Sequence, residues 1–209
     1  VLDYTHQYGQ VKGRALAALH LLGLQFIDHP VGCSAYVADS VKRYGLSPTV
    51  IRNGIDADTY TPTEDTTSAR TAVGLPRDRT IFVSVGAFLE RKDPQTVVEG
   101  FLESRRTADS TLVMVGDGPE RDACRTLADG HPSIVFPGFV ETVRPYLTAA
   151  DYFVSASLGE GLPVAVLEAL ACGLPVCLSD IDPHEEILEF HPSAGELFTP
   201  GDSSALASS

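Results

Sequence analysis

Short apolar runs alternate with amphipathic stretches along the chain from Thr80 onward. The apolar runs are rich in β-branched and aromatic residues and predict strands at residues 80–86, 111–116, 133–138, 151–157 and 175–179. The stretches between them predict helices at residues 94–106, 119–130, 142–150, 163–172 and 185–190. Strands that are apolar on both faces and alternate with helices are typical of a parallel sheet covered on both sides. We therefore predict an α/β fold, a Rossmann-like doubly wound parallel sheet that binds ligands beyond the carboxyl ends of its strands.

The first 46 residues show a different pattern: a strand-like 1–6, an apolar helix around 15–24 and a second helix near 35–45. This pattern resembles the closing part of another α/β unit. The residues that follow are rich in Asp, Thr and Pro, with a turn signal at Asn53-Gly54. Because the chain opens and closes within elements, we expect a fragment, truncated at its C-terminus. The predicted parts are a remnant of an N-terminal domain, an interdomain connection and a ligand-binding domain, at residues 1–51, 52–79 and 80–209.

Charge and composition narrow the class of partner. The net charge of −13 argues against a nucleic-acid partner, because phosphate backbones are bound by concentrated Lys and Arg. Four scattered cysteines without zinc-site spacing favour buried, reduced thiols in a reducing compartment. The longest apolar runs fall short of the roughly 18–20 residues that span a bilayer, and no signal-peptide pattern opens the chain. We expect a cytoplasmic protein with no transmembrane segment, and peripheral contact with the inner face of the membrane stays open.

The segment EGLPVAVLEALACG, residues 160–173, carries two carboxylates in otherwise apolar surroundings. A buried carboxylate is costly unless it is paired or hydrogen-bonded. Pro163 and Gly173 predict a helix between them, with Glu160 before its start and Glu168 about five residues in. Free N–H groups at the start of that helix could bind a phosphate, and the two carboxylates could accept hydrogen bonds from sugar hydroxyls. The alternative is a helix-start Glu favoured by the dipole and a second Glu on a solvated face, and the spacing alone does not choose.

This segment belongs to a series of five stretches that follow one another along the chain: VSVGAFLERKDPQTVVEGF, TLVMVGDGPERD, IVFPGFV, YFVSASLGEGLPVAVLEALACGLPV, which contains the segment, and SDIDPHEEIL. Together they resemble the nucleotide-sugar-binding domain of the family-4 (group 1) retaining glycosyltransferases, which have the GT-B fold. Upstream, VGCSAYVADSVKRYG and VIRNGIDADTYTP resemble that family's passage from the acceptor domain to the donor domain. The resemblance therefore covers nearly the whole chain.

The resemblance implies roles for the residues that match the family's motifs. Glu168 matches the glutamate that binds the ribose, and Glu160 matches the one placed near the donor sugar. Lys92 matches the lysine that binds the diphosphate and stabilises charge as it leaves; read alone, it would be a surface lysine. Four residues match the lining of the sugar or the backbone N–H groups that meet the diphosphate: Gly161, Leu162, Val164 and Ala165.

One position departs from the family. An Arg usually follows the glycine of the first strand, and here Gly86 is followed by Ala87. Arg91 is a candidate to replace the missing cation. His6 is a candidate for the acceptor-domain histidine near the reacting sugar, with a plain turn histidine as the alternative. The loops expected to flank the nucleotide contribute Gly86, Gly116, Gly118, Gly138 and Phe139.

The resemblance implies a hexosyltransferase-type enzyme that moves a sugar from a UDP-, GDP- or ADP-sugar to a glycan or lipid-linked acceptor hydroxyl. Such enzymes retain the anomeric configuration, serve polysaccharide or glycolipid assembly, and generally need no metal or other cofactor. Three alternatives stay open: a nucleotide-sugar epimerase of the same architecture, a nicotinamide-dependent oxidoreductase, and a donor-binding module. The glycine fingerprint of the oxidoreductases is missing from the sequence. We expect the isolated chain to bind a donor without transferring its sugar.

Overall fold

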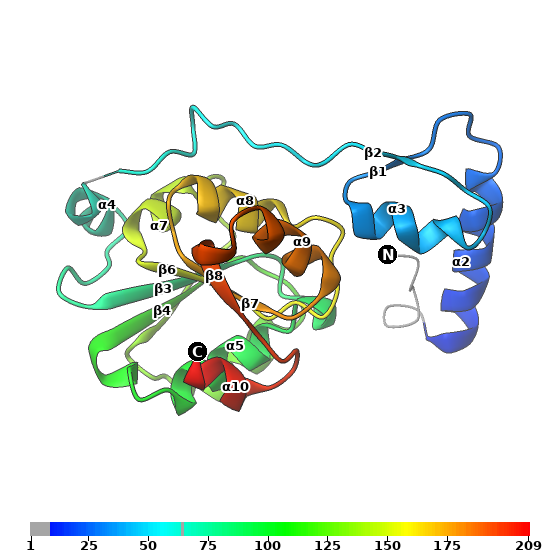
Figure 1. The fold of residues 1–209 in the computed structure, drawn as a ribbon. Coiled ribbons are helices and arrows are strands. Elements are labelled where there is room, and N and C mark those ends of the chain that lie inside the picture. Colours follow the sequence, from blue (N-terminus) through cyan, green and yellow to red (C-terminus); the bar gives the residue numbers. More distant parts are fainter. Residues whose placement is uncertain (1–8, 64) are drawn as a thin grey trace.

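The computed structural model describes residues 9–63 and 65–209. A six-stranded sheet fills the larger part of the molecule, and its strands run parallel in the order β5-β4-β3-β6-β7-β8 (Figure 1). The strands are β3 (Thr80–Val85), β4 (Ser110–Val115), β5 (Ile134–Gly138), β6 (Tyr152–Ser155), β7 (Val176–Ser179) and β8 (Gly195–Phe198). The strand order reverses between β3 and β6, as in doubly wound nucleotide-binding sheets. The predicted α/β, Rossmann-like fold is confirmed.

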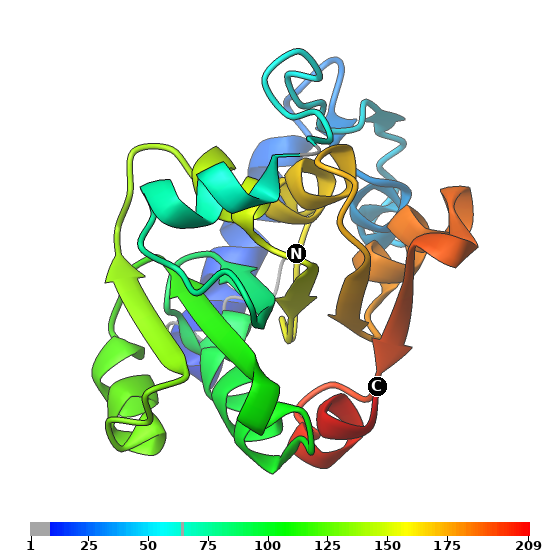
Figure 2. The same cartoon turned by 90° about the vertical axis from the view of Figure 1, so that its left-hand side faces the viewer.

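Helices cover both faces of the sheet (Figures 1 and 2). One face carries α5 (Pro94–Glu103), α6 (Arg121–Ala128) and α10 (Ser203–Ser208), and the other carries α4 (Thr66–Ala72), α7 (Arg144–Ala149), α8 (Val164–Ala171) and α9 (Asp182–Phe190). Strand β4, the second strand from one edge of the sheet, is buried along its whole length. Val113 and Val115 enter one apolar cluster, whereas Leu112 and Met114 enter the other, as the alternation of side chains across a strand requires. Each face of the sheet therefore has its own core.

The ends of the elements differ from the sequence pattern in identifiable places. Strand β8 was not predicted, because only the last of its four residues is buried and the others include a glycine and a glutamate. Helix α4 lies inside the predicted connection, where its buried Arg70 donates hydrogen bonds to the carbonyls of Ala149, Arg77 and Arg79. Short 3₁₀ turns complete this part of the chain at Glu90–Lys92, Thr107–Asp109 and Pro192–Ala194.

Helix α8 begins one residue later and ends one residue earlier than predicted, with Cys172 as its C-cap. Pro163 is its N-cap, with extended backbone, and no side chain caps this end. Gly173 has φ of 81°, which only glycine adopts readily, and follows the last residues of the helix. Its N–H bonds the Leu170 carbonyl at 2.9 Å, and the Leu174 N–H bonds the Ala169 carbonyl at 3.0 Å. The carboxyl end of α8 is therefore fixed, while its amino end is left open.

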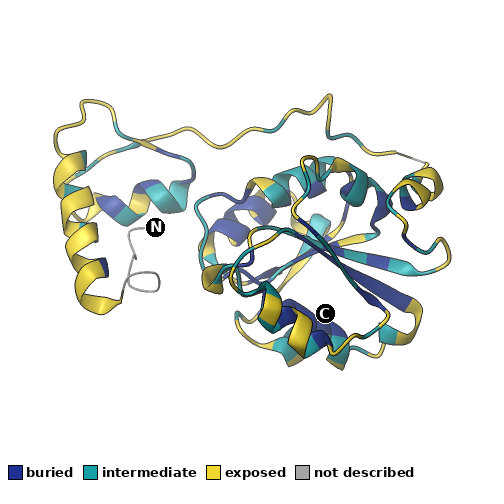
Figure 3. Cartoon of the chain, turned by 180° about the vertical axis from the view of Figure 1, so that it is seen from behind, coloured by how far each residue is buried: buried dark blue, intermediate teal, exposed yellow. Residues whose placement is uncertain are grey.

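The N-terminal unit contains α2 (Gln10–Leu24), β1 (Val31–Gly32), α3 (Ala35–Lys42) and β2 (Thr49–Val50), and the two strands pair in parallel. The strand-like stretch 1–6 lies outside the described residues. Helix α2 exposes most of its apolar side chains, including Leu19 at 65% and Leu22 at 55% (Figure 3). Of its residues only Gly13 is buried. This helix therefore contributes little to the cores described here.

A buried carboxylate joins the N-terminal unit to the sheet domain. Glu186 on α9 accepts hydrogen bonds from the backbone N–H groups of Ala35 and Tyr36, at 2.9 and 3.1 Å, at the start of α3. Arg52 of the connection pairs with the same carboxylate, with Nη2 at 2.8 Å from Oε1. Burial alone would raise the pKa of Glu186, but these donors outweigh it and the net pKa is lowered. We call Glu186, Arg52 and the first turn of α3 the α9 latch.

Glu186→Ala is expected to loosen the start of α3 without unfolding the sheet. The substitution leaves two backbone N–H groups and Arg52 without their charged acceptor. This should lower the free energy of local opening by about 2 kcal/mol, which corresponds to roughly 30-fold faster exchange. Hydrogen exchange at the Ala35 and Tyr36 amides measures this effect. Glu189→Ala, an exposed glutamate on the same helix, is the control and should change neither rate. Equal protection in both variants would contradict the latch.

Candidate functional site

The predicted site residues gather at the carboxyl end of the sheet, near the point where the strand order reverses. The turn after β3 and the loop after β6 meet there, because the Leu158 N–H donates to the Arg91 carbonyl at 2.8 Å. The turn after β3 is closed by Asp93, whose φ of 45° is unusual for a residue other than glycine. Asp93 also caps α5 through Thr96. Lys92 is thus held on a rigid turn beside the loop that carries Glu160.

Glu160 has the partners that a buried carboxylate requires. Its side chain is 7% exposed, and Oε1 accepts hydrogen bonds from Lys92 Nζ and from Ser157 Oγ, the latter at 2.8 Å. Arg91 Nη1 lies 3.5 Å from Oε2 and donates to the Gly159 carbonyl at 3.2 Å. The ammonium and the carboxylate therefore form an ion pair that excludes most water. Because Arg91 is half exposed, it contributes less to this pair than Lys92.

The open end of α8 adjoins this ion pair. A small cavity of about 30 Å³ is lined by Lys92, Glu160, Pro163, Ala165, Gly86 and Ala87, among others. Uncapped N–H groups at a helix start carry partial positive charge and attract anions. Val164, in this first turn, is 42% exposed. The arrangement places one cation, one carboxylate and a helix amino end around a single small space.

Glu168 lies one helical turn further along α8 and meets the connection. The Tyr60 hydroxyl donates a hydrogen bond to the Glu168 carboxylate. The pKa of Tyr60 is raised to about 12, chiefly by burial and further by this hydrogen bond and the negative charge of Glu168. Tyr60 also packs against the apolar cluster that contains Val166 and Ala169. The second carboxylate of the segment therefore has a partner from outside it, as the first does.

The loop between the two carboxylates is held by the N-terminal part of the chain. Leu162 is buried, and its carbonyl accepts a hydrogen bond from Asn53 Nδ2 at 2.9 Å. Gly161 faces Cys33, whose Sγ would lie 3.0 Å from a β-carbon at that position. A side chain at 161 would push against the N-terminal unit. The two residues predicted to line the donor sugar therefore sit where both parts of the chain meet.

The predicted glycine loops lie side by side along the edge of the site. A β-carbon on Gly116 would come within 1.9 Å of the Gly86 carbonyl oxygen, and one on Gly118 within 2.5 Å of the Phe88 carbonyl oxygen. These two glycines are needed for the loops to approach one another, which is a structural reason for them that requires no ligand. Gly138 ends β5 with φ of 87°, and Phe139 after it is 77% exposed. His6 lies outside the described residues.

A family model described as glycosyl transferases group 1 matches residues 79–209. That range is more than half of the 209-residue chain. The chain belongs to the group 1 glycosyl transferases.

Named relatives are identical to this group 1 glycosyl transferase at about a third of the aligned positions. The putative teichuronic acid biosynthesis glycosyltransferase TuaC of Bacillus subtilis is 34% identical over 173 residues, which are 81% of this chain and 42% of TuaC. The Escherichia coli UDP-Gal:alpha-D-GlcNAc-diphosphoundecaprenol alpha-1,3-galactosyltransferase is 31% identical over 141 residues, 64% of this chain and 36% of that enzyme. The chain thus spans less than half the length of these curated relatives.

Solved structures agree on the fold. The Anabaena protein HepE, in complex with UDP and glucose, superposes with a TM-score of 0.83 at 21% identity, covering 93% of this chain and 56% of HepE. Sucrose-phosphate synthase of Thermosynechococcus elongatus gives a TM-score of 0.81 at 25% identity, covering 99% of this chain and 54% of that one. The sheet domain of this group 1 glycosyl transferase is therefore the C-terminal half of a GT-B fold.

Several residues at the site of this group 1 glycosyl transferase carry no signal in the sequence. Ser157, Tyr60 and Asn53 are ordinary polar residues, and only the fold brings them to Glu160, Glu168 and Leu162. His184 lies in the first turn of α9, fully buried, and its Nδ1 is 2.8 Å from the Ser179 carbonyl oxygen. In the part of the chain that the structure describes, its Nε2 has no hydrogen-bond partner.

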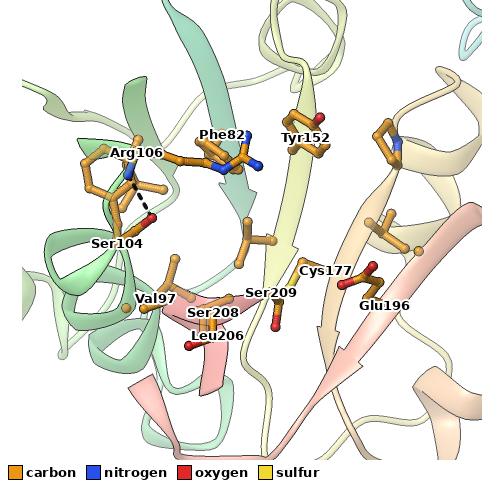
Figure 4. Close-up of a pocket in the computed structure, with 18 of the residues that line it drawn as sticks. Phe82, Val97, Ser104, Arg106, Tyr152, Cys177, Glu196, Leu206, Ser208 and Ser209 are labelled. Carbon is orange, nitrogen blue, oxygen red and sulfur yellow. Dashed lines mark hydrogen bonds between the residues drawn. The ribbon is translucent and has the colours of Figure 1, made fainter. Parts of the chain in front are cut away.

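A second and larger cavity lies away from these residues. It measures about 940 Å³ and lies between α5, α10 and the amino ends of β6, β7 and β8 (Figure 4). Phe82, Tyr152, Cys177 and Glu196 line it, and none of the predicted site residues that the structure describes does. Ligands of such sheets bind at the opposite, carboxyl ends of the strands. We therefore place the functional site at the smaller cavity.

Within residues 9–63 and 65–209, no group of three or more His, Cys, Asp or Glu side chains could hold a metal ion. No helix in the same ranges combines the length and the apolar character needed to cross a membrane.

His184 should make the stability depend on pH. Burial is the main cause that lowers its pKa below the ordinary 6.5, so the folded protein keeps the imidazole neutral where the unfolded chain takes up a proton. Stability is therefore lost as the pH falls below about 6.5. The melting temperature of His184→Asn should fall less between pH 7.5 and 5.5 than that of the wild type. His29→Gln, at an exposed position, should keep the wild-type slope, and a parallel slope for His184→Asn would count against this assignment.

Proposed function

We propose that the chain is the donor-binding half of a retaining glycosyltransferase that uses a nucleoside-diphosphate sugar. The observation that carries the proposal is the buried Lys92–Glu160 pair beside the uncapped start of α8. A diphosphate on the helix start would meet the N–H groups of Val164 and Ala165. Glu168, further along α8, would accept hydrogen bonds from the ribose hydroxyls.

In this proposal Lys92 stabilises the departing diphosphate. Cleavage of the bond between the sugar and the diphosphate leaves negative charge on the leaving oxygen, and a fixed ammonium lowers the energy of that state. Glu160 then accepts hydrogen bonds from the donor sugar, and Ser157 keeps its carboxylate oriented. The leaving oxygen helps to remove the acceptor proton on the same face, which retains the configuration without an enzyme nucleophile.

We further propose that no metal ion takes part in the transfer. Lys92, Arg91 and the start of α8 supply the positive charge that a divalent cation supplies in other transferases. Arg91 would replace part of the charge missing at Ala87, because it reaches the Glu160 carboxylate from the same turn as Lys92. Sugar transfer by a full-length protein that contains the chain should persist in excess EDTA. Loss of transfer in EDTA, with recovery only when a divalent cation is added, would contradict the proposal.

The acceptor is proposed as the hydroxyl of a glycan or lipid-linked glycan at the inner face of the cytoplasmic membrane. The support comes from relatives: one is named for teichuronic acid biosynthesis and one for a diphosphoundecaprenol-linked acceptor. The chain spans 36% and 42% of the length of these two relatives and 56% of the length of HepE. We therefore propose that this chain binds the donor but does not transfer its sugar to an acceptor. Incubation with labelled nucleotide sugars, with and without acceptors, separates binding from transfer.

Glu168→Ala and Lys92→Ala should act on different steps. Loss of the ribose partner at Glu168 should weaken nucleoside-diphosphate binding to the chain about tenfold. Loss of Lys92 should lower kcat about 100-fold in a full-length protein that contains the chain. Calorimetry and steady-state kinetics give the two values.

The controls are the exposed residues Glu189 and Lys42. Glu189→Ala matches the charge lost in Glu168→Ala, and Lys42→Ala matches the charge lost in Lys92→Ala. Neither control residue lines the small cavity, so neither substitution should change the measurements. If Glu168→Ala and Lys92→Ala also left binding and turnover at wild-type values, the assigned roles would be wrong.

A further inference from the structure

Arg121 is the first residue of α6 and reaches over the end of the neighbouring strand β5. Its Nη2 lies 3.4 Å, and its Cζ 3.9 Å, from the point where a β-carbon on Gly138 would stand. The guanidinium therefore occupies the space that the glycine leaves open. Phe139, the next residue, is 77% exposed. A planar cation and an exposed aromatic side chain thus belong to the same corner of the sheet.

The hydrogen-bonding capacity of Arg121 is mostly unused. A guanidinium has five N–H donors. Within the described part of the chain its hydrogen-bond partner is Asp117, with Nη1 at 3.3 Å from Oδ2, and its buried Nε has none. A buried donor without a partner costs free energy, so such a group in a folded protein calls for an explanation. Since the side chain as a whole is still 25% exposed, a ligand can contact it from the solvent side.

The position of Arg121 separates it from the diphosphate. The cavity beside Lys92 follows β3, and Arg121 is not among the residues that line it. Gly138 follows β5, which lies two strands away in the order β5-β4-β3. At about 4.8 Å per strand this is roughly 10 Å from the turn that carries Lys92. A nucleotide with its phosphates at α8 would point its base, not its phosphates, towards such a place.

We infer that Arg121 reads the carbonyl edge of the donor's nucleobase, with Phe139 offering a stacking surface. The inference rests on the proposed donor-binding function and adds a specificity-determining residue to it. A guanidinium only donates hydrogen bonds, so it fits base edges that present acceptors, such as uracil O4 or guanine O6 and N7. The corresponding edge of adenine keeps the N7 acceptor but carries the N6 amino group, a donor, in place of guanine O6, so it cannot pair with both prongs of the guanidinium. The Asp117 contact fixes the orientation of the guanidinium.

The test compares ligands that share a diphosphate and differ in the base. Calorimetric titration of the chain with UDP, GDP, ADP and inorganic pyrophosphate should show UDP or GDP binding more tightly than ADP. Arg121→Ala should weaken the preferred nucleotide about tenfold or more, leave pyrophosphate unchanged and bring the preferred nucleotide close to ADP. Arg121→Lys keeps the charge and most of the stem but loses the planar fork, so it should lose most of the base preference.

Arg125→Ala is the matched control, because Arg125 is exposed on the same helix and its removal changes the net charge equally. It should leave every affinity at the wild-type value. Melting temperatures of the three variants establish that each is folded.

The outcomes separate the two claims. If the wild-type chain binds none of the nucleotides, the proposed function fails and the inference fails with it. If the chain binds nucleotides but Arg121→Ala and Arg121→Lys leave the base preference intact, only the inference is overturned. Equal weakening of pyrophosphate and nucleotides would also overturn it, because Arg121 would then serve the diphosphate or the loop structure.

Discussion

The pairing of Glu160 with Lys92 is the interaction on which the rest of the site depends. A carboxylate that is 7% exposed would be costly without a partner. The ammonium that neutralises it comes from the turn after β3, while the carboxylate comes from the loop after β6. One ion pair therefore fixes two loops whose strands adjoin at the reversal of strand order. The start of α8, the small cavity and Ser157 are arranged around that pair.

The same need for a partner recurs at two other carboxylates, the half-buried Glu168 and the buried Glu186. Glu168 finds Tyr60, and Glu186 finds Arg52 and the first turn of α3. Tyr60 and Arg52 both belong to residues 52–79, the segment that the sequence marks as a connection. This segment is more than a tether, because Tyr60 contacts Glu168 at the proposed ribose position and Asn53 fixes the Leu162 carbonyl. The connection thereby supplies part of the site that the strands and helices alone would leave incomplete.

Much of the architecture could be predicted from the sequence, because buried parallel strands are apolar on both faces. β4 is the clearest case, with every residue buried. β8 could not be, since a short edge strand with exposed positions has no distinctive pattern. For the site, the ordered motifs indicated Lys92, Glu160 and Glu168, and the fold brings the first two into contact. Ser157, Tyr60, Arg121 and His184 could not be identified, because their importance arises from distant segments that only the folded chain brings together.

The α9 latch has a mechanical consequence. It pins one end of α3 against the sheet domain, and the Asn53 contact with Leu162 lies in the next residue after Arg52. Any rotation of the N-terminal unit about these bonds has its axis beside the loop of Gly161 and Leu162. Atoms near the axis of a rotation move least, so such a rotation would leave that loop in place. The largest displacement would fall on α2, at the far side of the unit (Figure 1). The contacts that join the N-terminal unit to the sheet domain therefore lie beside the loop of the proposed donor site.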